Sequence, residues 1–294
     1  MVSKNSLEII GKFKINDFNF SEHTTYRLGG KADYAYAPKT PGGAVAVYDY
    51  FKENKIPFVI LGNGSNVLVS DKGYRGGVIC TYCLSGIRQT GENKLYCRAG
   101  TKVGTLMKYC ADNCLGGLEY LAGIPATIGG IVYMNGGAGG KYIADNVLKV
   151  KLYDGKVHNF SNKYCNFAYK YSTMQDINAL ILGVELAVYP LNGQIVKDNI
   201  KNALLKRSGL PVGASCGCVF KNADGCSAGK IIDEAGLKGL SFGGAEVSEK
   251  HANFIISTSS SSYDVLTLIK ELKRLVLERT GVALEEEVVY IGDF

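Results

Sequence analysis

Two cysteines, Cys216 and Cys218, lie one residue apart in the stretch GASCGCVFKN, residues 213–222. Such thiols can hold a metal ion, form a redox pair, or act singly by transferring a proton. A zinc site needs a second pair of ligands, and the other close pair, Cys80 and Cys83, has no histidine nearby. A disulfide between Cys216 and Cys218 would be strained. We therefore expect no metal, and we favour a single working thiol.

A second stretch, GNGSN at residues 62–66, is suited to binding an anion. It lies between two short apolar runs, at 56–61 and 67–70, which are typical of buried strands. A Rossmann fingerprint would need glycine at position 67 followed by a helix, and a P-loop would need Gly-Lys-Ser/Thr. Both loops are excluded. The backbone N–H groups of the five residues still predict an anion-binding nest, formed by Gly62, Asn63, Gly64, Ser65 and Asn66.

A third stretch, GLEYLAGIPATIGGIVYMNGGAGG at residues 117–140, is rich in paired glycines. Glycine at this density disfavours a helix interior. Tight turns around a buried strand would explain the pattern. So would a backbone that approaches a large flat ligand closely, because only glycine leaves the space.

The remaining pattern predicts helices at 41–51, 101–112, 195–207, 227–236 and 263–280, and strands at 180–190 and 283–292. Thr40 and Pro41 open the first helix, and Gly236 and Gly281 end the last two. The turn at 190–193 divides the chain into two expected domains. The first, 1–193, contains two α+β subdomains at roughly 1–80 and 81–193. The second, 194–294, is smaller, and its final strand returns to the active site.

Composition limits the functional class. The chain has 294 residues, a net charge of +6 and 46% hydrophobic residues, which is typical of a soluble globular protein. Its lysines and arginines are scattered, which argues against a nucleic-acid stripe and is compatible with phosphorylated small ligands. We find no signal peptide or membrane span, and the odd count of nine cysteines argues against a disulfide framework. We expect a cytoplasmic monomer.

Seven segments, in this order, resemble the UDP-N-acetylenolpyruvoylglucosamine reductase (MurB) family, in its shorter form without a substrate-capping tyrosine insert. They cover nearly the whole chain: TTYRLGGKADY (24–34), LGNGSNVLVSDKGYRG (61–76), the stretch at 117–140, SCGCVFKN (215–222), SAGKIIDEAGLKG (227–239), SEKHANFII (248–256) and LEEEVVYIG (284–292).

The resemblance implies an α+β fold, with an FAD-binding domain of the vanillyl-alcohol-oxidase-like (PCMH-type) fold and a smaller C-terminal α+β substrate domain. It implies non-covalent FAD, with NADPH as hydride donor. The expected reaction turns the enolpyruvyl ether of a UDP-sugar into the lactyl ether, a step in peptidoglycan precursor synthesis. The GNGSN nest would hold the FAD pyrophosphate. Residues that match the family's flavin-contacting segment are Gly123, Ile124, Pro125, Thr127, Gly129 and Gly130, extended by Asn135 and Gly136.

The resemblance also implies a catalytic trio. Cys218 occupies the position of the family's proton-donating serine, a chemically reasonable exchange because a thiol is far more acidic than an alcohol. Lys170, in Tyr-Lys-Tyr-Ser, replaces the family's arginine and so keeps the charge but loses the bidentate fork. The pattern Leu-Glu-x-Glu-Val selects Glu287 as the acid. Glu285, which shares its face of a strand, is the fallback.

Asn222, Arg207, His251 and Tyr169 are the candidates for binding the UDP-sugar. Two other functions remain open. The first is a flavin oxidase of another substrate on the same fold. The second is a catalytically impaired relative that binds FAD and a UDP-sugar, because the two substitutions in the trio could weaken catalysis.

Overall fold

The computed structural model describes residues 4–177, 179–223, 225–259 and 261–294. The chain forms two compact units, each built from separated segments. Unit 1 comprises the chain up to Asn16, Tyr34–Asn63 and Gly76–Ser208. Unit 2 comprises Asp17–Asp33, Gly64–Arg75 and Gly209–Phe294. Each unit has its own buried core, and each is described here by itself.

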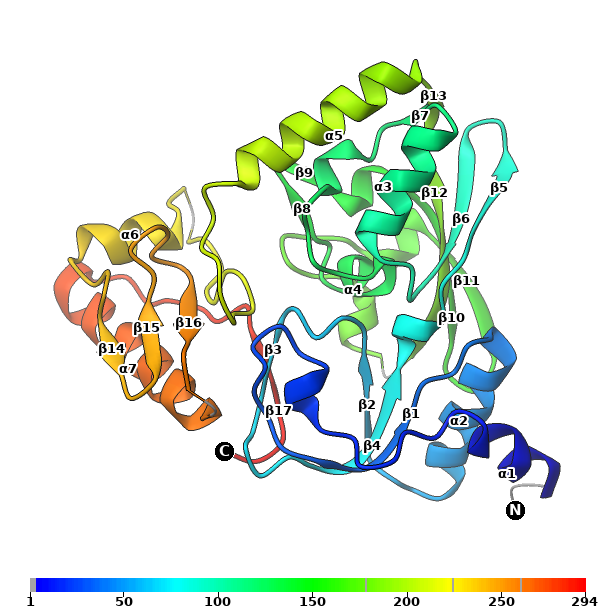
Figure 1. Cartoon of the computed structure of the whole chain (residues 1–294), viewed down its shortest axis with the longest axis horizontal. Helices are drawn as coiled ribbons and strands as arrows, with labels where there is room; N and C mark the ends of the chain where they lie inside the picture. Colours follow the sequence, from blue (N-terminus) through cyan, green and yellow to red (C-terminus); the bar gives the residue numbers. More distant parts are fainter. Residues whose placement is uncertain (1–3, 178, 224, 260) are drawn as a thin grey trace. The chain divides into compact units, whose positions relative to one another are not determined.

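The largest sheet of unit 1 is antiparallel and has the order β11-β10-β12-β6-β5 (Figure 1). One of its faces packs on helices, because apolar residues alternate along its strands and join α3 and α4 in one buried cluster. The elements are β5 (Ile87–Gly91), β6 (Lys94–Arg98), β10 (Val147–Tyr153), β11 (Val157–Ser161), β12 (Leu180–Ala187), α3 (Val103–Asp112), α4 (Ile128–Tyr133) and α5 (Gly193–Arg207).

A second core of unit 1 is largely aromatic and includes Tyr48, Phe51 and Phe58. It lies between α1 (Lys4–Gly11), α2 (Pro41–Glu53) and the sheet β1-β4-β2. The predicted helix start is confirmed, because the Thr40 side chain accepts a hydrogen bond from the Gly43 N–H at 3.1 Å. The strands are β1 (Ala32–Tyr36), β2 (Phe58–Leu61) and β4 (Tyr74–Cys80).

Shorter elements complete unit 1. Two small antiparallel pairs join β7 (Leu115–Gly116) to β13 (Tyr189–Pro190) and β8 (Gly137–Ala138) to β9 (Lys141–Tyr142). Single-turn 3₁₀ helices lie along both units, at Phe20–Glu22, Thr81–Cys83, Glu119–Leu121, Ile143–Asp145, Asn162–Cys165 and Thr173–Gln175.

Unit 2 contains two helices, α6 (Ala228–Glu234) and α7 (Ser262–Thr280), and the antiparallel sheet β14-β15-β16 (Figure 1). Helix α7 packs on the sheet, and α6 packs on α7. The sheet strands are β14 (Ser241–Phe242), β15 (Ala245–Val247) and β16 (Ile255–Ser257). A separate parallel pair joins β3 (Val67–Val69) to β17 (Val289–Ile291). The α7 prediction is confirmed: its apolar stripe is buried except for the partly exposed Leu275, and Gly281 ends it with φ 74°.

The glycine-rich stretch departs from expectation, because Gly129 and Gly130 lie inside the short helix α4. One contact explains the start of the helix, and another explains the glycine inside it. Thr127 caps it by accepting the Gly130 N–H at 3.4 Å, and a Cβ on Gly129 would lie 2.9 Å from the Cβ of Ala99. Glycine is therefore required there by close packing inside the protein.

Two further expectations differ from the structure. The strand expected at 283–292 is regular only at Val289–Ile291, because residues 285–287 pair with a short loop segment rather than with a strand. Helix α5, expected to open the C-terminal domain, packs on α3 within unit 1. The division of function at residues 193 and 194 stays a prediction.

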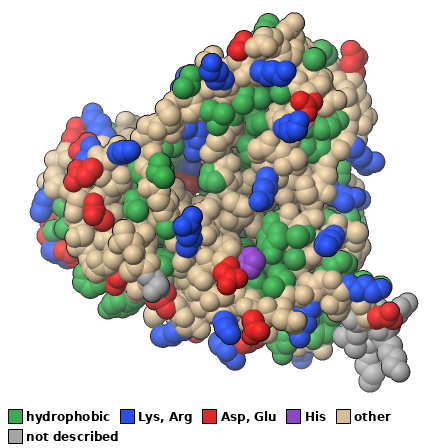
Figure 2. All heavy atoms as spheres, viewed as in Figure 1, with side chains coloured by type: hydrophobic (Ala, Val, Ile, Leu, Met, Phe, Trp, Pro, Cys, Tyr) green, Lys and Arg blue, Asp and Glu red, His purple; other side chains and the backbone are tan. Residues whose placement is uncertain are grey.

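The surface shows scattered charge. On the face in Figure 2, lysine and arginine side chains are interspersed with acidic and apolar ones. None of the helices in the described ranges is long and apolar enough to cross a membrane.

Replacing Gly129 by alanine should lower the free energy of unfolding by about 1–3 kcal/mol, because the added methyl would overpack the contact with Ala99. Gly104→Ala is the matched control. Gly104 also lies in a helix, α3, and its Cβ would meet no atom within 4 Å, so this change should stabilise by about 0.5 kcal/mol. Urea unfolding of both variants measures the difference. Equal effects would contradict the packing argument.

Candidate active site

The segment that carries Cys218 pairs with the segment that carries Glu287, both in unit 2. The N–H of Glu287 donates to the Val219 carbonyl at 2.7 Å, and the N–H of Lys221 donates to the Glu285 carbonyl at 2.8 Å. Phe220 and Glu286 form an antiparallel bridge between these two bonds. The candidate acid therefore lies beside the residue that follows the candidate proton donor.

The three consecutive glutamates have different surroundings. Glu286 accepts a hydrogen bond from Lys273 of α7 at 2.8 Å, and Glu285, largely exposed, forms an ion pair with Lys221. The Glu287 carboxylate instead lies close enough to Cys216 for its negative charge to raise the pKa of that thiol. Because Cys218 is separated from Cys216 by one residue, the candidate acid and the candidate proton donor lie in one neighbourhood.

The two thiols at the start of the sequence argument differ sharply. Burial raises the pKa of Cys216 to about 12, and its side chain lies beside the buried Tyr26. Cys218 is partly exposed, and Gly217 between them has φ 81°. In the described residues, no group of three or more histidine, cysteine or acidic side chains could hold a metal ion. Cys216 is thus a structural thiol, and Cys218 is the accessible one of the two.

Two of the expected flavin-binding segments lie side by side in unit 1. The Asn63 side chain donates to the Pro125 carbonyl at 2.7 Å. A Cβ on Gly62 would lie 2.6 Å from the Thr127 hydroxyl oxygen. The structure thus brings the first half of GNGSN against the stretch that begins at Gly123.

The GNGSN loop retains open hydrogen-bond donors. Within the described chain, the backbone N–H groups of residues 62–66 donate to no protein acceptor. Gly64 has φ 62°, and a Cβ there would lie 2.4 Å from the His23 carbonyl oxygen. Unpaired N–H groups in such a turn fit the diphosphate of FAD.

Asn66 also has a structural part in unit 2. Its side chain donates to the Glu287 carbonyl at 3.0 Å, and its own carbonyl accepts the Val289 N–H at 3.0 Å. The final residue of the expected nest therefore holds the acidic segment in place.

Several polar groups in the stretch at 123–136 form hydrogen bonds with other groups of the protein. The N–H of Gly129 donates to the Ala99 carbonyl at 2.8 Å, and that of Gly136 to the Ile131 carbonyl at 2.8 Å. The Asn135 side chain, 4% exposed, donates to the Ala168 carbonyl at 2.8 Å. Its oxygen accepts the Ala144 N–H at 3.2 Å. Sequence reasoning missed this tie to the Ala168 loop. Flavin contact by the eight matched residues stays a prediction.

Lys170 occupies a two-residue turn between Ala168 and Tyr171, which exchange hydrogen bonds of 3.1 and 3.2 Å. It has φ 54°, a conformation uncommon for residues other than glycine and frequent at functional sites. The Lys170 carbonyl accepts the Gln175 side chain at 3.0 Å. The fully buried Ser172 donates to the Tyr133 carbonyl at 2.7 Å. The turn is therefore anchored at the C-terminal end of α4.

The four candidates for substrate binding fall in both units. In unit 1, the exposed Tyr169 packs edge-on against Tyr142, and Arg207 lies against Gly123, where a Cβ would approach it within 3.1 Å. In unit 2, the Asn222 oxygen accepts the Ala228 N–H at 3.1 Å, at the start of α6.

His251, also in unit 2, has a structural role. Its Nδ1 accepts the Asn253 N–H at 3.3 Å, and its ring packs on Phe254. Burial lowers the pKa of His251, which favours the neutral ring that this acceptor role requires.

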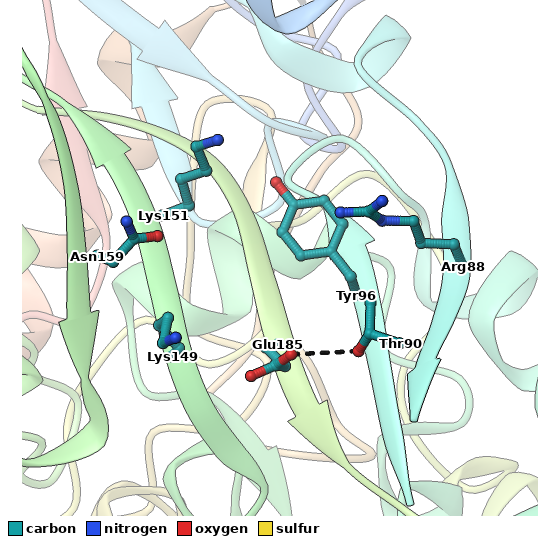
Figure 3. Close-up of a pocket in the computed structure, with 7 residues that line it drawn as sticks. All are labelled: Arg88, Thr90, Tyr96, Lys149, Lys151, Asn159 and Glu185. Atoms are coloured by element: carbon teal, nitrogen blue, oxygen red, sulfur yellow. Dashed lines mark hydrogen bonds between the residues drawn. The ribbon is translucent and has the colours of Figure 1, made fainter. Parts of the chain in front are cut away.

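A shallow hollow of about 210 Å³ lies on the opposite face of the large sheet from α4 (Figure 3). In Figure 3, the Tyr96 hydroxyl and the Lys151 amine point to the same end of it. Its lining residues are Arg88, Thr90, Tyr96, Lys149, Lys151, Asn159 and Glu185. It contains none of the predicted site residues.

Comparison with known families first defines the class. A profile described as an FAD binding domain matches residues 32–161. One described as the C-terminal domain of UDP-N-acetylenolpyruvoylglucosamine reductase matches residues 210–291. With the open nest and the two α+β units, these matches define a flavoprotein that combines an FAD-binding domain with a smaller C-terminal domain, as expected from the sequence.

The chain belongs to the UDP-N-acetylenolpyruvoylglucosamine reductase (MurB) family. It is 36% identical to the reductase of Caldanaerobacter subterraneus, covering 96% of this chain and 95% of the relative. It is also 36% identical to that of Clostridioides difficile, covering 98% and 97%. The crystal structure of MurB from Thermus caldophilus is 32% identical, covers 94% of this chain and 98% of its own, and superposes with a TM-score of 0.80.

Alkylation of the native protein should distinguish the two thiols. At pH 8, iodoacetamide should modify Cys218 and leave Cys216 intact, because a thiol with a pKa of about 12 is ionised to only about 1 part in 10⁴ and is buried as well. Peptide mapping by mass spectrometry measures both sites, with the exposed Cys226 as internal reference. Modification of Cys216 at a rate close to that of Cys226 would show that the assignment is wrong.

Proposed function

We propose that this protein reduces the enolpyruvyl ether of UDP-N-acetylglucosamine to UDP-N-acetylmuramate, with NADPH as hydride donor and FAD as carrier, in peptidoglycan precursor synthesis. The observation that carries the proposal is the pairing of the Cys218 and Glu287 segments in a member of this family. It supports an acid and a proton donor in one neighbourhood, as reduction of a polarised double bond requires.

FAD, when bound, would supply the hydride chemistry, from NADPH to the methylene carbon of the enol ether. Of the protein's residues, Cys218 gives the proton from its Sγ to the neighbouring carbon, where the negative charge develops. Glu287, as an acid, and Lys170, as a cation, stabilise the charge on the substrate's carboxylate end. The thiol of Cys218 must remain protonated until that charge forms, because a thiolate has no proton to give.

The open N–H groups of the GNGSN loop would hold the FAD diphosphate, and the stretch at 123–136 would line the flavin. Tyr169, Arg207, Asn222 and His251 would contact the UDP-sugar. The proposal also includes a cytoplasmic location and a monomeric state. It assigns FAD binding to a domain at 1–193 and substrate binding to a domain at 194–294.

Anaerobic visible spectroscopy tests both half-reactions. NADPH should bleach the yellow flavin, and the UDP-sugar enol ether should then restore the colour promptly. Bleaching without recolouring would favour an impaired FAD- and UDP-sugar-binding relative. Rapid reoxidation when air is then admitted to the reduced protein, without the enol ether, would favour an oxidase.

Changes at Cys218 should affect only the second half-reaction. Cys218→Ala should slow flavin reoxidation by the enol ether by about 10²-fold or more, the range typical of a lost proton donor. Cys218→Ser should keep substantial activity, and flavin reduction by NADPH should be unchanged in both variants. Stopped-flow absorbance measures each rate. Equal loss of both half-reactions would contradict the proton-donor role.

Changes at Lys170 separate charge from geometry. Lys170→Arg should preserve or raise turnover, since it keeps the charge and restores the bidentate fork. Lys170→Met should slow reoxidation by the enol ether at least about tenfold, which corresponds to about 1.4 kcal/mol of transition-state stabilisation. The exposed Lys163, in the preceding single-turn helix Asn162–Cys165, provides the control Lys163→Met. An inactive arginine variant would indicate a pocket rebuilt around lysine.

A further inference from the structure

One buried amide holds the backbone directly after Cys218. The side-chain oxygen of Asn253 accepts the Phe220 N–H at 2.8 Å and the Val219 N–H at 3.2 Å. Its side-chain nitrogen donates to the Phe220 carbonyl at 2.8 Å. The Asn253 carbonyl also accepts the Val219 N–H, at 2.9 Å. Asn253 is 2% exposed, so water cannot substitute for these bonds.

Asn253 is itself held in a tight local structure. Its N–H donates to Nδ1 of His251, and the Phe254 N–H donates to the His251 carbonyl at 2.9 Å. Phe254 forms an antiparallel bridge with Cys218. A Cβ on Gly229 of α6 would lie only 3.0 Å from the His251 ring, so the ring packs closely against this helix. The amide therefore reaches Phe220 from a fixed support.

The Cys218 segment is thus gripped on two sides within unit 2. Asn253 pairs with Val219 and Phe220 on one side, and the Glu287 N–H pairs with the Val219 carbonyl on the other. The held Val219 nitrogen forms the peptide bond to the carbonyl carbon of Cys218, which is bonded in turn to the Cys218 α-carbon. The position of the Cys218 sulfur therefore depends on Asn253, which lies in the segment 248–256 but was not among the candidate site residues.

We propose that Asn253 is a positioning residue for Cys218: its amide fixes the thiol at the point from which it delivers its proton. This inference rests on the proposed function. An amide is required because the side chain must accept from one Phe220 backbone group and donate to the other. A carboxylate of the same shape could accept but not donate, and would face the Phe220 carbonyl oxygen with a negative charge.

Two single variants of Asn253, each also combined with Cys218→Ala, test the proposal through the half-reactions. Asn253→Asp keeps the shape of the side chain and loses its N–H donor. Asn253→Ser makes the side chain too short to contact the Phe220 backbone. Either should slow reoxidation of NADPH-reduced flavin by the enol ether at least about tenfold, with reduction by NADPH unchanged. When Cys218 is already alanine, the same change at Asn253 should lower the reoxidation rate by less than about twofold. The reason is that Asn253 acts through Cys218, so the two effects are not additive.

Asn146→Ser is the matched control. Its amide also donates to a backbone carbonyl, that of Ala187, at 3.0 Å, and accepts the Tyr120 hydroxyl at 2.9 Å, but it lies in unit 1. It should lower stability without changing the reoxidation rate. If Asn253→Asp and Asn146→Ser have the same effect on that rate, or if the Asn253 and Cys218 effects multiply, the positioning role is wrong.

The alkylation rate of Cys218 provides a second readout that does not depend on turnover. Asn253→Asp should change it at least about threefold relative to Cys226, because the thiol is displaced. If the enol ether does not reoxidise the reduced flavin of the unchanged protein, the proposed function fails, and if Cys218→Ala leaves reoxidation unaffected, the proton-donor role fails; in both cases the alkylation rate still tests the positioning. An unchanged alkylation rate and an unchanged reoxidation rate in folded Asn253→Asp would together overturn the inference.

Discussion

The hydrogen bond from the Glu287 N–H to the Val219 carbonyl, 2.7 Å long, is the contact around which the candidate site of unit 2 is organised. It sets the register between two segments that are far apart in sequence. With this register, Glu286 faces Lys273 and Glu285 faces Lys221, so that Glu287 is directed to the neighbourhood of the two thiols. A shift by one residue would exchange these surroundings, because alternate residues of an extended chain face opposite sides.

Local signals predicted much of the framework. Thr40 and Pro41 marked the start of α2, and the apolar stripe and Gly281 marked α7, because caps and helical periodicity are properties of a few neighbouring residues. The FAD-binding class and the family followed from ordered motifs. The choice of Cys218 as the candidate proton donor followed from its motif position. The burial of Cys216, which separates the two thiols physically, was not.

What the sequence could not predict depends on distant partners. Glycine is required at position 129 of this helix because Ala99 leaves no room for a side chain, and local propensity does not reveal such a contact. Asn135 and Asn253 each join two backbone groups of a remote loop, and no periodicity marks an amide that will do so. Lys170 carries positive φ inside a turn that Asn135 and Gln175 hold. These are polar contacts fixed by tertiary structure.

The pairing of β3 with β17 has a consequence for how the protein is made. The bond between the Asn66 side chain and the Glu287 carbonyl spans 221 positions of sequence. Contacts of such separation form slowly, since closing a long loop costs entropy before any contact offsets it. During synthesis, β3 leaves the ribosome long before β17, so β3 has no paired strand until β17 has been made. The core of unit 2 and the position of the candidate acid therefore both wait for the last residues to be made, because Leu284 and Val288 belong to that core.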